Sequence, residues 1–175
     1  MKVRDIERLL AANGIGKAKM DVITRRLREA HQLPVAARGL NAPELTGSFA
    51  AKVLIATAGS AKGVSADRRL QLLRGLTSDR DSGTKLLSRL GRLLEGSPEL
   101  DQVAECRIGR NVREASILYA DGQIEKFSTT KPPDYSFRLR TEGTIPGDLL
   151  RQLATSIANG DSIPNPDTDE DPDND

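Results

Sequence analysis

The chain has 175 residues, no tryptophan and only 3% aromatic residues, so it can form one ordinary domain or two small ones with a mainly aliphatic core. No apolar run approaches the roughly 20 residues of a membrane span, and the charged N-terminus lacks the apolar segment of a secretory signal. Cys106 is the only cysteine, which excludes an internal disulfide and a multi-cysteine metal site. We therefore expect a soluble, cytoplasmic protein without a bound metal or cofactor.

The near-neutral net charge of +1 conceals a strong asymmetry along the sequence. Residues 1–100 contain 18 lysines and arginines against 10 acidic residues, and residues 101–160 contain 8 of each. Residues 161–175 contain 7 acidic residues and no basic one. This distribution is typical of a basic body that meets an anionic partner and carries an acidic tail. A solvated helical surface without a partner is the alternative interpretation.

Two short helices are predicted at the N-terminus. The apolar residues of the segment 3–10 recur at helical spacing, and Asn13-Gly14 supplies a stop. After the turn at 14–16, a second helix is predicted from Lys17 to Ala30, with an apolar line formed by Met20, Ile23 and Leu27. Two helices joined by a tight glycine turn are the minimal helix-turn-helix arrangement.

A loop and three further helices are predicted over the next sixty residues. The loop at 34–43 carries Arg38 near its tip. The first helix, roughly Thr46 to Ala58, is nearly all small and apolar, as a buried central helix would be. The second starts near Ser65 and presents Leu70, Leu73 and Leu76. The third, Thr84 to Glu95, has five leucines on one face.

The periodicity changes from helical to alternating near residue 103. The segments 115–119 and 123–127 flank Asp121-Gly122, which is a strong hairpin signal. A third strand is predicted at 135–139, and residues 104–112 are a candidate for a further strand. A last helix is predicted to open at Pro146 and to bury Leu149, Leu150, Leu153 and Ile157. Residues 159–175 hold three prolines and one aliphatic residue, so we expect a disordered tail.

These elements predict an α+β fold that is mainly α. We expect a helical DNA-binding domain at 1–100, a small ββ(β)α unit at 103–158 and a disordered acidic tail at 159–175. The 103–158 unit is expected to form a homo-oligomer or to bind a protein partner.

The second helix is the most informative segment for function. It carries five cations against only Asp21 and Glu29, and its apolar line can dock it while the cations remain free for phosphate oxygens and guanine edges. Arg25 and Arg28 are expected to read bases and Arg26 to contact phosphate. A solvated, arginine-rich helix is the alternative. The full set of expected DNA-binding residues is Lys17, Lys19, Thr24, Arg25, Arg26, Arg28 and, from the following loop, Arg38.

No enzymatic constellation emerges from the sequence. The glycine segments GIGK and GSAKG do not complete a phosphate-binding loop, and the DTDED run of the tail lacks the glycine and closing glutamate of a calcium loop. His31 is the only histidine, which leaves little material for a histidine-based triad. Cys106 is expected to be a small buried residue rather than a nucleophile. We therefore predict that the chain is not an enzyme.

The stretch from Ile15 to Ala58 contains ITRRLREAHQLP, then RGLNAPELT, then AAKVLIATAG. It resembles small helical DNA-associated proteins of bacteriophages and prophages. The resemblance implies a helix-turn-helix transcriptional regulator or a small terminase subunit, and the hairpin unit and acidic tail depart from the terminase pattern. DNA binding by a phage-type regulator is the function predicted first, and a protein–protein adaptor with a basic docking face is the alternative from another class.

Overall fold

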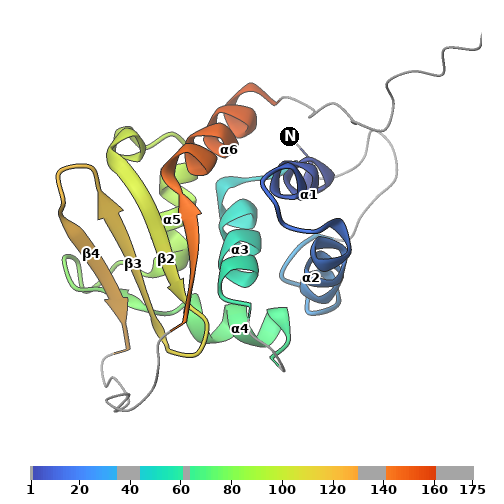
Figure 1. Ribbon diagram of the computed structural model, residues 1–175, viewed down its shortest axis with the longest axis horizontal. Helices are drawn as coiled ribbons and strands as arrows, with labels where there is room; N and C mark the ends of the chain where they lie inside the picture. The colour runs from blue at the N-terminus through green and yellow to red at the C-terminus, as the bar shows by residue number, and fades with distance from the viewer. Residues whose placement is uncertain (1, 35–43, 61–63, 130–140, 161–175) are drawn as a thin grey trace, which may run out of the picture.

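The computed structural model describes residues 2–34, 44–60, 64–129 and 141–160. Within these ranges the chain forms six α-helices and one five-stranded antiparallel sheet, so the fold is α+β and mainly α, as predicted (Figure 1). The helices are α1 Val3–Ala12, α2 Lys17–Glu29, α3 Gly47–Ala58, α4 Ala66–Leu73, α5 Leu86–Leu94 and α6 Gly147–Asn159. The strands are β1 Thr77–Ser78, β2 Val103–Gly109, β3 Glu114–Tyr119, β4 Ile124–Ser128 and β5 Glu142–Pro146, and a short 3₁₀ helix covers Pro98–Gln102.

The helices form on the apolar spacing that the sequence displays. In α5 the leucines at 86, 90, 93 and 94 are buried, and Arg92 on the same helix is exposed. Nine of the twelve residues of α3 are buried, because this helix lies between the sheet and the α1–α2 pair (Figure 1). Thr46 starts α3, and its Oγ1 accepts a hydrogen bond from the Phe49 N–H at 3.3 Å. The predicted apolar spacing is therefore confirmed in both helices.

A histidine with an unusual backbone conformation follows the C-terminus of α2. His31 has a φ of +54°, the left-handed region that glycine normally occupies at this position. The His31 N–H donates to the Arg28 carbonyl at 3.0 Å, and the Gln32 N–H donates to the Leu27 carbonyl at 2.8 Å. These two bonds satisfy carbonyls that the end of a helix otherwise leaves without partners.

The sheet has the strand order β1-β4-β3-β2-β5. The predicted hairpin is present as β3 and β4, with Gly122 at a φ of +83° in its turn. The segment at 135–139, predicted as a third strand, lies outside the described residues. Two strands were not predicted: β5 pairs with β2 over residues 142–146, and β1 pairs with the end of β4.

One face of the sheet packs on the helices and the other faces solvent. Alternate residues of the strands are buried, among them Cys106, Ile117, Phe127 and Ile145. The outer edge of β4 is also covered, because Asp79 follows β1 and binds the backbone of Lys126 twice. The Asp79 N–H donates to the Lys126 carbonyl, and the Lys126 N–H donates to Asp79 Oδ1, both at 2.9 Å.

The helical part and the sheet share one core. Buried side chains from α1 to α6 and from strands β2 to β5 form a single contiguous apolar cluster. The division predicted near residue 100 therefore does not separate two cores. Strand β5 approaches α3 so closely that a Cβ at Gly143 would overlap the carbonyl oxygen of Ala58, and this contact requires glycine.

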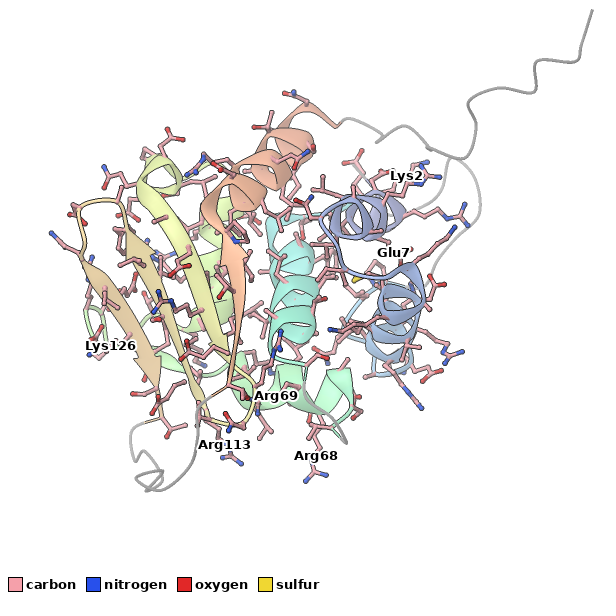
Figure 2. All side chains as sticks on the ribbon, viewed as in Figure 1. Lys2, Glu7, Arg68, Arg69, Arg113 and Lys126 are labelled. Atoms are coloured by element: carbon pink, nitrogen blue, oxygen red, sulfur yellow. The ribbon has the colours of Figure 1, made fainter. Side chains whose placement is uncertain are left out.

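Arg69 joins the helices to the sheet from inside the molecule. Its side chain lies between α4 and the end of β2 and is 5% exposed, whereas Arg68 on the same helix points into solvent (Figure 2). Arg69 Nε donates to the Gly59 carbonyl at 2.9 Å, and Nη2 donates to the carbonyls of Gly109 and, at 2.8 Å, Val112. A helix end and a strand end are thus held by one guanidinium.

None of the helices in the described ranges is long and apolar enough to cross a membrane.

Candidate nucleic-acid interface

The predicted helix-turn-helix segment is present as α1, a short turn and α2. The side-chain amide of Asn13 donates to the Leu9 carbonyl at 2.9 Å, and Gly14 follows with a φ of +85°, so the chain reverses within the residues 13–16. Helix α2 then packs on the core through Met20, Ile23 and Leu27, which are at most 4% exposed. The apolar line predicted for this helix is confirmed, and it fixes which side chains face solvent.

Four cations lie on the solvent face of α2. Lys17, Lys19, Arg25 and Arg26 are all exposed, and the only acidic residues on this helix are Asp21 and Glu29. Glu29 lies 3.1 Å from Arg26 and 4.0 Å from Arg25. Both pairs are more than half exposed, so they contribute little stability and do not prevent the guanidinium groups from meeting another anion.

Thr24 and Arg28 were expected to contact DNA, and the structure places both elsewhere. Thr24 is fully buried, and its hydroxyl donates to the Met20 carbonyl at 3.0 Å one turn back in the helix, so its assignment to the DNA contact set is wrong. Arg28 points toward α1, where its Nη2 donates to Glu7 Oε1 at 3.0 Å. Because Arg28 is 26% exposed and Glu7 is 17% exposed, this ion pair joins α1 to α2, and the expectation that Arg28 reads bases is corrected.

One predicted DNA-binding cation remains, and further exposed arginines lie beside α2. Arg38 lies outside the described residues. Arg68 on α4 and Arg74 directly after this helix are exposed. Arg74 Nη1 donates to the side-chain oxygen of Gln32, just beyond the end of α2, at 3.3 Å. Arg69, which follows Arg68 in the sequence, is buried as described above and does not contribute to this surface. The exposed arginines on and directly after α4 therefore add to the positive charge beside the outer face of α2.

A buried polar cluster was missed in the sequence. Glu125 on β4 is 3% exposed and accepts hydrogen bonds from Ser78 Oγ at 2.7 Å, from the Tyr119 hydroxyl at 2.7 Å and from Arg89 Nε at 3.1 Å. Arg89 also pairs with Glu99 at 2.5 Å. The sequence held one signal: in Ile124–Ser128 the alternation puts Glu125 on the same face as the apolar Phe127.

The hydrogen bonds of this cluster stabilise the fold. Glu125 has a donor from β1, β3 and α5, so the carboxylate ties the edge of the sheet to the helix beneath it. Burial raises the pKa of the Tyr119 hydroxyl, and its hydrogen bond to Glu125 raises it further, so the phenol remains protonated at neutral pH. A protonated, buried phenol that donates to a carboxylate holds the cluster together rather than moving a proton.

Nucleophile and metal chemistry find little support in the described residues. Burial raises the pKa of Cys106 to about 12, so the thiol stays protonated and unreactive. Across residues 2–34, 44–60, 64–129 and 141–160, no group of three or more histidine, cysteine, aspartate or glutamate side chains is arranged to hold a metal ion.

Comparison of the chain with protein-family models, curated proteins and solved structures found no match in any of the three.

Proposed function

We propose that the chain binds double-stranded DNA through the solvent face of α2. The observation that supports this proposal is the set of four exposed cations, Lys17, Lys19, Arg25 and Arg26, on a helix whose opposite face is buried. A helix with its side chains is about 10–12 Å wide, which matches the major groove of about 12 Å. The turn before α2 leaves the N-terminal half of the helix open to a duplex, since Lys17, Ala18 and Lys19 are all exposed there.

The charges of this face set the expected salt dependence. If each of the four cations neutralises one phosphate, the logarithm of the binding constant falls with the logarithm of salt concentration with a slope of about −3.6. Asp21 and Glu29 lie on the same helix and weaken the local positive potential. We therefore expect non-specific affinity in the usual range of about 10⁻⁴–10⁻⁶ M at physiological salt.

Arg25 is the residue best placed to read a base. Its side chain is 65% exposed, and its contact with Glu29 is long at 4.0 Å, so the guanidinium can leave Glu29 for a guanine edge. Arg26 forms the shorter pair and is assigned to phosphate. Base contact by Arg25 together with backbone contact by the other cations combines the two kinds of contact that a sequence-selective transcriptional regulator uses.

The test compares two double variants that remove the same charge. Arg25→Gln/Arg26→Gln changes the proposed face, whereas Arg107→Gln/Lys126→Gln changes exposed cations on the sheet, and Lys126 lies on the opposite side of the molecule from α2 (Figure 2). Binding to a labelled random duplex is measured by fluorescence anisotropy at several salt concentrations. The α2 variant should lower the magnitude of the salt slope by about two, and the sheet variant should leave it unchanged.

Two outcomes would contradict the proposal. If the wild-type chain does not bind DNA at low salt, DNA binding is wrong. If both double variants lose affinity equally, the overall charge and not α2 is responsible, and the assignment of the interface fails. Circular dichroism of each variant confirms that the fold is retained.

A protein partner is the second candidate, and one observation favours it. Val22 on α2 is 48% exposed and Val64, just before α4, is 37% exposed, and both line a groove that Lys19 and Arg26 flank. An acidic peptide with one aliphatic side chain has the complementary chemistry. The probe is a peptide with the sequence of residues 161–175, which has seven acids and Ile163, added to the chain ended at Gly160. Binding that Val22→Ser abolishes while DNA affinity is kept would favour this function.

A further inference from the structure

A small cavity lies where the α1–α2 pair meets α3, β5 and the start of α6. Its volume is about 130 Å³. The floor is apolar and includes Leu10, Leu54 and Ile145, which are at most 3% exposed. An aliphatic cavity of about 150 Å³ in another protein holds one benzene molecule. This cavity therefore has room for a group of about six non-hydrogen atoms.

The rim of the cavity is basic. Lys19 of α2 and Arg110, which follows β2, both line it, and both are exposed. Arg110 is held in place because its Nε donates to the Ala58 carbonyl at 3.2 Å and its backbone N–H donates to the Thr141 carbonyl at 2.8 Å. No aspartate or glutamate of the described chain lines the cavity. The side chain of Lys19 forms no hydrogen bond or ion pair with a described residue.

We propose that this cavity binds a small aliphatic carboxylate. The carboxylate would lie at the rim, which is lined by an ammonium from α2, Lys19, and a guanidinium that follows β2, Arg110. The branched aliphatic part would occupy the floor against Leu10, Leu54 and Ile145, where each buried methylene group leaves water. For a ligand of about seven non-hydrogen atoms, a Kd on the order of a millimolar lies within the ceiling on binding energy per atom that small ligands reach.

The location of the cavity means that a bound ligand would also affect DNA binding. Lys19 lies both on the cavity rim and on the cationic face of α2, so a bound carboxylate neutralises one of the four cations assigned to DNA. The ligand would then weaken DNA binding. This consequence rests on the proposed function, but ligand binding itself does not, and the two are measured separately.

The experiment titrates the full-length chain with 3-methylbutanoate and follows backbone amide shifts by NMR. Saturable shifts should appear for residues around the cavity. Its neutral isostere 3-methylbutanamide should bind at least about tenfold more weakly because it lacks the charge, and acetate should bind weakly because it leaves the floor empty. Lys19→Gln and Arg110→Gln should each raise the Kd about tenfold. Lys17→Gln and Arg113→Gln are matched controls outside the cavity and should change it less than about twofold.

Ile15→Trp gives an independent test. Ile15 is half-buried on the cavity rim, so the larger indole side chain of tryptophan should fill the cavity. Loss of binding in this variant, with the fold retained by circular dichroism, supports the assigned location. The proposal is overturned if 3-methylbutanoate shows no saturation, if the amide or acetate binds equally well, or if the control variants weaken binding as much as the rim variants. None of these measurements involves DNA, so they test ligand binding even if the chain does not bind DNA.

Discussion

Replacement of Arg69 by methionine should destabilise the protein strongly. The guanidinium donates to the carbonyl oxygens of Gly59, Gly109 and Val112, and the side chain is 5% exposed. Hydrogen bonds from a charged group contribute about 1.5–3 kcal/mol each, but the variant also no longer has to bury a charge. Methionine retains the apolar stem and leaves three carbonyl groups short of a donor. We therefore expect a loss of about 3–5 kcal/mol in the free energy of unfolding.

The matched control is Arg68→Met on the preceding position of the same helix. Arg68 is exposed, so its replacement should change the free energy of unfolding by less than about 0.5 kcal/mol. Arg69→Lys keeps the charge on a shorter donor group. Its loss in the free energy of unfolding should lie between those of Arg68→Met and Arg69→Met. For a chain of this length, 3–5 kcal/mol corresponds to a Tm that is lower by about 6–20 °C.

Urea unfolding followed by far-ultraviolet circular dichroism measures all three variants, because the chain has no tryptophan to report by fluorescence. A free energy of unfolding for Arg69→Met within about 1 kcal/mol of that for Arg68→Met would contradict a stabilising role for the buried guanidinium. In that case the buried guanidinium would be no more than a replaceable filler of the space between α4 and β2.

Four further predictions concern the polar core, a helix end, the thiol and the tail. Glu125→Gln should lower the free energy of unfolding by about 2–4 kcal/mol in a urea titration, since one carboxylate serves three donors. His31→Gly should raise it by about 0.5–1 kcal/mol, because glycine adopts a φ of +54° without strain; a decrease would show that the imidazole contributes instead. Cys106 should resist a thiol reagent at pH 8 until the chain is unfolded. Its pKa is raised from 9.0 to about 12, so the stability that it contributes is complete below pH 9 and falls as pH rises toward 12, and Cys106→Ala should lack this component. Deletion of 161–175 should tighten DNA binding at low salt, with the gain fading as salt is added.

The helices and the hairpin could be predicted because each has a local signal. Leucines at helical spacing in α5 and Asp121-Gly122 in the hairpin turn depend only on neighbouring residues. Strand β1 has two residues and no periodicity, and it exists because Ser128 and Phe127 pair with it from fifty positions away. Strand β5 contains glycine and proline, which weaken any strand signal, and becomes a strand because β2 provides its partner.

In the candidate interface, too, the features that depend on distant residues could not be predicted from the sequence. Helical geometry identified the buried line of α2, and the same geometry places Thr24 one turn from Met20 on that line, so the polar character of threonine was a poor guide to its exposure. The fate of Arg28 depends on Glu7, which belongs to another helix. The cavity is formed by residues that are up to about 140 positions apart along the chain, from Leu10 to Leu149, and so leaves no local trace in the sequence.

The pairing of Asp79 with Lys126 affects how the protein can assemble. An exposed strand edge is a template for addition of a strand from another molecule, and this is a common route to aggregation. Here the backbone N–H and carbonyl of Lys126 are already occupied by Asp79, and β1 covers the last two residues of β4. Intermolecular strand addition at β4 would first have to displace these bonds. This edge of the sheet is therefore protected against strand addition at the residues from Lys126 to Ser128.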